Sequence, residues 1–183
     1  MRAVRIIPYN NMCVIIVKPS GIKLPNEKIL NQAALHNPHG FGFCTAERIY
    51  KTLFFDLFMK EIRKADKNEP CIIHFRYATT GSVKRANCHP FKNGNISFAH
   101  NGVLNVETKN DMTDSETFFK DIAMKAINKY GYNSRTFDDI MIKNMGFSKF
   151  ALMSGRKIKL FGNFTEYSDG CYYSNLNFLN RYY

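Results

Sequence analysis

The sequence predicts one α+β domain with antiparallel sheet. Segments with strand patterns and segments with helical periodicity follow one another in separate runs, which is typical of this class. The chain has 183 residues, of which 45% are hydrophobic and 22% charged, so it is long enough to bury a core of its own. Its longest apolar stretch near the start, residues 12–17, is far shorter than the roughly 20 residues that cross a bilayer. We therefore expect no membrane partner and no secretory signal.

The first half of the chain is expected to contain four strands and two helices. Short apolar segments rich in β-branched or aromatic residues predict strands at residues 4–7, 13–17, 41–45 and 71–77. Asn26 is a suitable N-cap for a helix over about residues 27–36, whose apolar side chains share one face. The same periodicity predicts a second helix over residues 55–64.

In the second half, strands are expected at residues 96–100 and 103–106. They flank Asn101-Gly102, a dipeptide that favours tight hairpin turns. A long helix is expected from Asp114 or Ser115 to about Lys129, and another over residues 136–145. From residue 149 onward, alternating residues with glycines between them predict a closing set of antiparallel strands.

The chain carries a net charge of +11, and no acidic residue occurs between Glu69 and Glu107. We interpret most of this charge as a solubilising surface. The alternatives are attraction to an acidic partner or nucleic acid, or a basic segment that serves an anionic substrate group. Because the basic residues are scattered along the chain, we expect at most weak, nonspecific binding to nucleic acid.

Five cysteines are present, which is an odd number, and none forms a C-x-x-C motif. Neither a disulfide framework nor a metal site is indicated. Reduced thiols are typical of cytoplasmic proteins, so we expect that location. Cys44 and Cys71 lie in apolar runs and are expected in the core.

Four segments, taken in order and spacing, resemble one family. They are residues 12–17 (MCVIIV), 37–42 (NPHGFG), 74–81 with 87–91 (HFRYATTG and NCHPF), and 100–102 with 113–117 (HNG and TDSET). Together they resemble the glutaminase domain of class II glutamine amidotransferases, which are N-terminal-nucleophile hydrolases. The resemblance extends from residue 12 to about residue 162. It implies a four-layer α/β/β/α sandwich of two mainly antiparallel sheets.

Cys13 is the candidate nucleophile. It opens a strand of buried type, so its thiol would be held rigidly, and a thiol attacks amides well once a base takes its proton. The resemblance implies that this base is the α-amine of Cys13 itself, which requires Cys13 to be the first residue of the mature chain. The alternative is that Cys13 is a small core residue.

Arg76 and Asp114 are the candidate substrate clamps. A guanidinium at the end of a buried strand needs an anion, and its planar fork matches a carboxylate. The resemblance implies that Arg76 binds the α-carboxylate of glutamine with Thr79 and Thr80, and that Asp114 binds the α-ammonium. The alternatives are a structural ion pair between Arg76 and Asp114, and a helix N-cap at Asp114.

Asn101 and Gly102 are the candidate oxyanion site. A lone Asn-Gly is by default a hairpin turn, but the resemblance implies that the Asn101 amide and the Gly102 N–H stabilise the tetrahedral intermediate. Gly102 would also border the bound substrate. Tyr77 and His89 are assigned to the supporting loop.

Residues 1–12 form an extension before a single glutaminase-like domain over residues 13–183. Met12 could be the true first residue and be removed, or the extension could be a propeptide. In the third explanation the extension stays, and the protein is inactive.

The resemblance implies hydrolysis of glutamine to glutamate and ammonia through a Cys13 thioester, with no cofactor. Three alternatives stay open: a separate synthase protein accepts the ammonia, ammonia release is the whole activity, or the amide that is hydrolysed is not that of glutamine. The alternative is a catalytically inactive binding or structural protein of the same fold.

Overall fold

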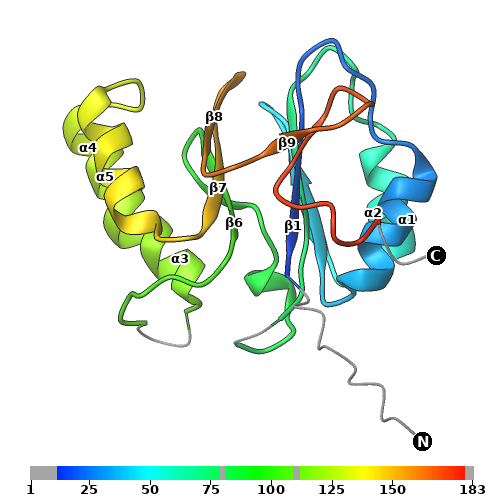
Figure 1. The fold of residues 1–183 in the computed structure, drawn as a ribbon, viewed down its shortest axis with the longest axis horizontal. Helices are drawn as coiled ribbons and strands as arrows, with labels where there is room; N and C mark the ends of the chain where they lie inside the picture. Colours follow the sequence, from blue (N-terminus) through cyan, green and yellow to red (C-terminus); the bar gives the residue numbers. More distant parts are fainter. Residues whose placement is uncertain (1–11, 79–80, 109–111, 180–183) are drawn as a thin grey trace, which may run out of the picture.

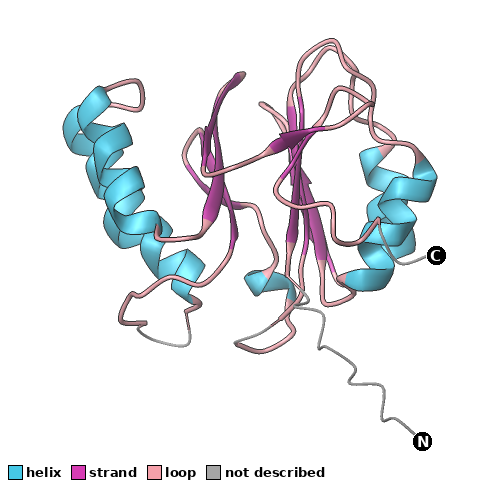
Figure 2. Ribbon diagram, viewed as in Figure 1, coloured by secondary structure: helices cyan, strands magenta, loops and turns pink. Residues whose placement is uncertain are grey.

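Two antiparallel sheets lie face to face between two layers of helices in the computed structural model (Figure 1). The structure describes residues 12–78, 81–108 and 112–179, so the strand expected at residues 4–7 lies outside the described residues. Figure 2 shows the helices confined to the two outer layers. The expected α+β class with antiparallel sheet is confirmed.

The larger sheet has six strands within the described residues, in the order β3-β2-β4-β1-β10-β9. In chain order these are β1 (Val14–Lys18), β2 (Phe41–Cys44), β3 (Ile49–Thr52), β4 (Cys71–Phe75), β9 (Thr165–Glu166) and β10 (Tyr172–Tyr173). Every residue of β1, β2 and β4 is buried, as their apolar sequences predict. Cys44 and Cys71 are fully buried core residues, as expected.

The smaller sheet has four strands in the described part of the chain, in the order β5-β6-β7-β8. They are β5 (Phe91–Asn93), β6 (Ile96–Asn101), β7 (Lys149–Ser154) and β8 (Lys157–Phe161). The register pairs Ile96 with Ser154 and Asn101 with Lys149. The antiparallel strands expected after residue 149 are therefore confirmed.

The prediction of a strand at residues 103–106 is wrong, because these residues form no strand. Asn101-Gly102 consequently does not join two paired strands. β6 is hydrogen bonded to β5 on one side and to β7 on the other. The segment that follows β6 therefore cannot fold back and pair with it. The tight turn lies instead at Gly94, between β5 and β6.

Helices α1 (Glu27–His36) and α2 (Phe55–Ile62) cover the outer face of the larger sheet (Figure 1). Both were expected from periodicity, and the Asn26 Oδ1 accepts a hydrogen bond from the Ile29 N–H at 3.0 Å, as a helix N-cap should. A single-turn 3₁₀ helix, η1 (Arg85–Asn87), precedes β5.

The smaller sheet is covered by one interrupted helix and by α5 (Arg135–Met145). The interrupted helix begins as α3 (Asp114–Phe118), passes through the π-helical turn η2 (Phe119–Ala123) and continues as α4 (Met124–Tyr130). The two expected helices are confirmed, but periodicity did not predict the π-helical turn. No helix among the described residues has the length and apolar character needed to traverse a lipid bilayer.

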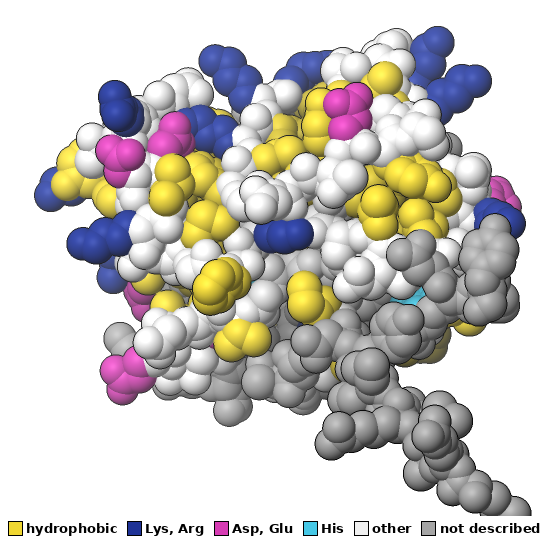
Figure 3. All heavy atoms as spheres, viewed as in Figure 1, with side chains coloured by type: hydrophobic (Ala, Val, Ile, Leu, Met, Phe, Trp, Pro, Cys, Tyr) yellow, Lys and Arg dark blue, Asp and Glu magenta, His cyan; other side chains and the backbone are white. Residues whose placement is uncertain are grey.

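The core between the sheets is made of small and medium side chains. They include Ala99 and Ala151, which are paired on the adjacent strands β6 and β7 of the smaller sheet. The two outer cores contain most of the buried phenylalanines. Lys and Arg side chains are spread over the visible face rather than gathered in one patch (Figure 3). Weak, nonspecific nucleic-acid binding stays a prediction.

Phe58 tests the outer core of the larger sheet. It is fully buried on α2, and its ring lies 5.4 to 6.2 Å from the rings of Phe41, Phe43, Phe55 and Phe75. We expect Phe58→Ala to lower the free energy of unfolding by about 3–5 kcal/mol, measured by urea denaturation.

Phe54→Ala is the matched control, because Phe54 adjoins the same helix but is 67% exposed. It should change the free energy of unfolding by less than about 0.5 kcal/mol. Equal losses in the two variants would contradict the described burial.

Candidate active site

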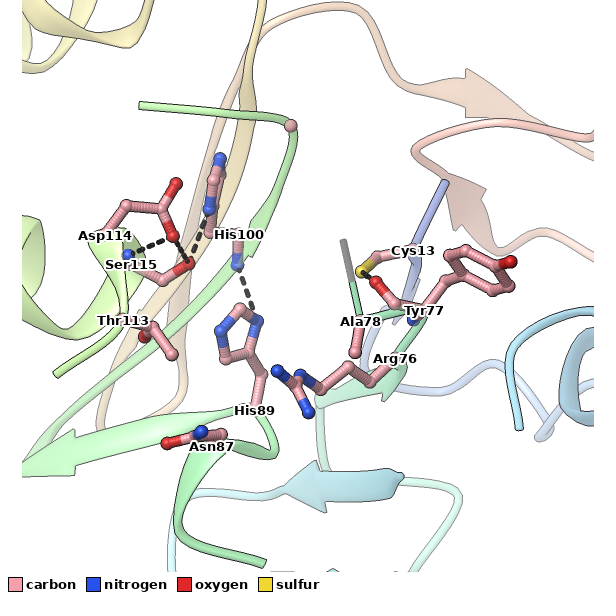
Figure 4. A pocket seen from close by; sticks show the side chains of 11 residues that line it. Cys13, Arg76, Tyr77, Ala78, Asn87, His89, His100, Thr113, Asp114 and Ser115 are labelled. Carbon is pink, nitrogen blue, oxygen red and sulfur yellow. Dashed lines mark hydrogen bonds between the residues drawn. The ribbon is translucent and has the colours of Figure 1, made fainter. Parts of the chain in front are cut away.

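A polar pocket opens where the ends of β4 and β6 meet the residue before β1 and the start of α3 (Figure 4). Cys13, Arg76 and Tyr77 lie on one side of it, next to the ends of β1 and β4, and His100, Asp114 and Ser115 lie on the other. The pocket is lined by Cys13, Arg76, Tyr77, Ala78, Asn87, His89, His100, Gly102, Thr113, Asp114 and Ser115. Segments far apart in sequence therefore converge on one site.

Cys13 directly precedes β1, and its thiol is held by the backbone of Tyr77. The Sγ atom lies 3.4 Å from the Tyr77 carbonyl oxygen and 3.3 Å from the Tyr77 nitrogen. Burial raises the pKa of this thiol above its usual value, although the Arg76 guanidinium opposes the shift. The thiol therefore needs a base before it can act as a nucleophile.

Arg76 follows β4 and is 5% exposed. Its Nη1 donates a hydrogen bond to the Ser82 carbonyl at 3.1 Å. Its backbone is fixed by the segment before β2, because the Arg76 N–H donates to Gly40 O and the Arg76 carbonyl accepts from the His39 N–H. Figure 4 shows the guanidinium directed toward the middle of the pocket. The other two expected carboxylate contacts, Thr79 and Thr80, lie outside the described residues.

Tyr77 and Ala78 are supported by His39, which lies in the segment at residues 37–42 that carries part of the family resemblance. The rings of His39 and Tyr77 lie 4.9 Å apart, and His39 Nδ1 accepts a hydrogen bond from the Ala78 N–H at 2.9 Å. The loop after β4 is thus held by the segment at residues 37–40.

Asp114 begins α3 with both carboxylate oxygens hydrogen bonded. Oδ2 accepts from the Leu104 N–H at 3.0 Å, while Oδ1 accepts from the Ser115 N–H at 2.7 Å and the Ser115 hydroxyl at 3.2 Å. The alternative N-cap role is wrong, because Thr113 Oγ1 accepts from the Glu116 N–H and is the cap. The ion pairs among the described residues do not include one between Arg76 and Asp114.

Gly102 lines the pocket, whereas Asn101 is buried beside it. The Asn101 Nδ2 donates to Ser174 Oγ at 2.9 Å, and its Oδ1 has no partner among the described residues. Gly102 has a φ of +139°, and a Cβ atom there would lie 2.4 Å from Ser148 Oγ. Only glycine fits this position without displacing Ser148.

Three buried histidines pack together at the pocket, and two of them, His89 and His100, line it. His89 Nδ1 lies 3.1 Å from His74 Nε2 and accepts from the His100 N–H at 3.3 Å, while His74 Nε2 lies 3.1 Å from His100 O. Gly42 makes room for this packing, since a Cβ there would lie 2.1 Å from His89 O. The supporting role of His89 stays a prediction. The packing of the His89 ring against His74 and His100 was not predicted.

Burial lowers the pKa of His74 to about 3 and that of His100 to about 4, and it holds the pKa of His89 well below its usual range. These side chains are therefore neutral at physiological pH. Neutral imidazoles carry one N–H each, so each ring has one donor and one acceptor.

The buried histidines predict a loss of stability in mild acid. Unfolding exposes them to water, where their pKa is about 6.5, so the unfolded state binds protons that the folded state excludes. The free energy of unfolding should be fully retained above pH 6.5 and fall as the pH drops toward 4, by up to about 1.4 kcal/mol per pH unit for each histidine. Urea denaturation at pH 7 and pH 5 measures this difference.

His74→Gln should reduce that difference, because it keeps a donor near His100 O but cannot titrate. Equal stability of the unmodified chain at pH 7 and pH 5 would contradict the burial of the three rings as neutral groups.

Comparison with known proteins agrees with this geometry. The family model for class II glutamine amidotransferases matches residues 59–158, just over half of the chain. This span contains Arg76, His89, Asn101, Gly102 and Asp114 and begins after Cys13. A search of curated proteins found no match. Since the family model covers most of the site and more than half of the sequence, the chain belongs to the class II glutamine amidotransferases.

Proposed function

We propose that this chain hydrolyses the side-chain amide of glutamine to glutamate and ammonia through a thioester on Cys13. One observation carries the proposal: the Cys13 thiol, the Arg76 guanidinium and the Asp114 carboxylate line the same pocket. It rests also on membership of the class II family. The family implies the N-terminal-nucleophile hydrolase fold, with which the four layers of Figure 1 agree.

Substrate recognition follows from the two charged side chains of the pocket. Arg76 binds the α-carboxylate with its planar fork, and Asp114 binds the α-ammonium. Thr79 and Thr80 complete the carboxylate site in this proposal. A cation and an anion placed apart select a zwitterion, so the substrate is a free amino acid rather than an internal residue of a peptide.

The base in this proposal is the α-amine of Cys13. The α-amine takes the thiol proton as Sγ attacks the amide carbon, which forms a tetrahedral oxyanion. The amine then returns this proton to the leaving nitrogen, so ammonia departs and the thioester remains. Water attacks the thioester with the same amine as base, and glutamate is released with a regenerated thiol.

Gly102 and Asn101 stabilise the oxyanion in this scheme. An Asn amide nitrogen carries two N–H groups, of which one is used by Ser174, so the second is available for the intermediate. The Gly102 N–H supplies the other donor. Neutral donors fixed by packing are well suited to a charge that exists only during the reaction.

The ammonia is released or passed to a separate acceptor protein, and the glutaminase step itself uses no cofactor. Activity also requires removal of residues 1–12, since otherwise the Cys13 nitrogen is a peptide amide. If they are retained, the protein is an inactive member of the fold that binds glutamine or a partner.

Processing is the sharpest test of the nucleophile. A chain that begins at Cys13 should release glutamate from glutamine, whereas a chain shown by mass spectrometry to retain residues 1–12 should be inactive. Cys13→Ser and Cys13→Ala should also abolish activity. Cys44→Ala is the matched control, because Cys44 is buried between the sheets away from the pocket and its loss should leave hydrolysis in place. Equal rates with and without the extension would refute the α-amine mechanism.

Substitutions at the carboxylate-binding Arg76 and at the oxyanion donor Asn101 should change different kinetic constants. Arg76→Lys should raise KM for glutamine strongly, because an ammonium cannot replace a bidentate fork. Asn101→Ala should instead lower kcat by about 10²–10³, the usual cost of one lost oxyanion donor. Steady-state assays of glutamate release distinguish the two effects. An Asn101→Ala enzyme with normal kcat would assign Asn101 to structure alone.

A further inference from the structure

A chain of hydrogen bonds links the smaller sheet to the pocket. His100, on β6, is 2% exposed, and Ser115, on α3, is 4% exposed. His100 Nδ1 lies 2.7 Å from Ser115 Oγ, which in turn lies 3.2 Å from Asp114 Oδ1. Figure 4 shows the three side chains in a row along one wall of the pocket.

The direction of these hydrogen bonds is fixed by proton counting. A carboxylate can only accept, so the single hydroxyl proton of Ser115 is donated to Asp114 Oδ1. Ser115 Oγ must then accept from His100, which places the one proton of the neutral imidazole on Nδ1. The bonds therefore all run from His100 through Ser115 to Asp114.

This arrangement occupies most of the acceptor capacity of Asp114. A carboxylate offers about four acceptor sites. The described structure fills three of them, with the Leu104 N–H, the Ser115 N–H and the Ser115 hydroxyl. The carboxylate is thereby held at both oxygens, and Oδ2 retains capacity for one further donor.

We propose that His100 and Ser115 are positioning residues that hold the Asp114 carboxylate for the α-ammonium of the substrate. They thus determine the preference for α-amino acids over analogues that lack the amine. The inference rests on the proposed function, because it assigns to Asp114 the recognition of the α-ammonium. It adds two residues that line the same pocket and act on the α-ammonium through Asp114.

The test compares L-glutamine with glutaramate, which keeps the carboxylate and the side-chain amide but has no α-amine. Ser115→Ala and His100→Leu remove a donor from the chain of hydrogen bonds. In a protein that begins at Cys13, each should lower kcat/KM for glutamine about tenfold, mainly through KM, because a hydrogen bond to a charged group is lost. The kcat/KM for glutaramate should stay within about twofold of the unmodified protein.

Conservative variants provide matched controls. Ser115→Thr keeps the hydroxyl, and the amide nitrogen of His100→Asn can donate from a position close to that of Nδ1. Both should keep the selectivity for glutamine over glutaramate within about threefold of the unmodified protein. Retained hydrolysis of glutaramate also shows that a variant is folded, and circular dichroism checks this independently.

Equal losses for both substrates, or no loss for either, would overturn the positioning role. If the unmodified protein hydrolyses neither substrate, the proposed function fails and binding decides the inference. Calorimetric titration of the Cys13→Ala chain with L-glutamate and with glutarate should then show a preference for L-glutamate that Ser115→Ala and His100→Leu reduce about tenfold. Absence of that preference in the Cys13→Ala chain would overturn the inference as well.

Discussion

The pairing of β1 with β4 is the interaction on which the site depends. Its register sets Val14 opposite Phe75, so the residue before β1 lies beside the residues that follow β4. Cys13 is thereby placed against the backbone of Tyr77, next to Arg76. Both strands are fully buried, and a slip of one residue would turn every side chain of β1 to the opposite face. The packing of the two cores therefore fixes the distance between the proposed nucleophile, Cys13, and the Arg76 guanidinium.

The other half of the site comes from the smaller sheet. Small side chains and glycines let the segments of the two sheets approach closely enough to form one pocket. Small side chains such as Ala99 and Ala151 face the larger sheet. Gly42 leaves space for the His89 backbone, and Gly102 leaves space for Ser148. A side chain at either glycine would force apart elements that the pocket needs together. The glycines thus act on the site through packing, although only Gly102 lines it.

The features that were predictable from sequence depend on local patterns. The N-cap at Asn26, the helix after Phe54 and the buried strand β4 each follow from a few neighbouring residues. The strand expected at residues 103–106 failed because pairing partners are set by the whole sheet, and β6 already has two neighbours.

The candidate site was predicted unevenly for the same reason. Residue spacing alone left Asp114 as an N-cap or a ligand, and the structure decides against the cap by placing Thr113 there. The roles assigned to Cys13 and Arg76 came from resemblance to a family rather than from periodicity. The contact between His74, His89 and His100 joins three separate segments, so no local pattern indicates it.

Charge and burial together support the proposal that this pocket binds a zwitterion. The histidines around it are neutral because burial lowers their pKa values. Among the residues described as lining the pocket, Arg76 and Asp114 are then the charged side chains, one of each sign and on opposite sides. The two side chains are not joined to each other in an ion pair, so each is able to face a different group of a bound ligand. In the proposed complex, a ligand with a carboxylate at one end and an ammonium near it contacts both side chains, whereas a ligand with either charge alone contacts one of them.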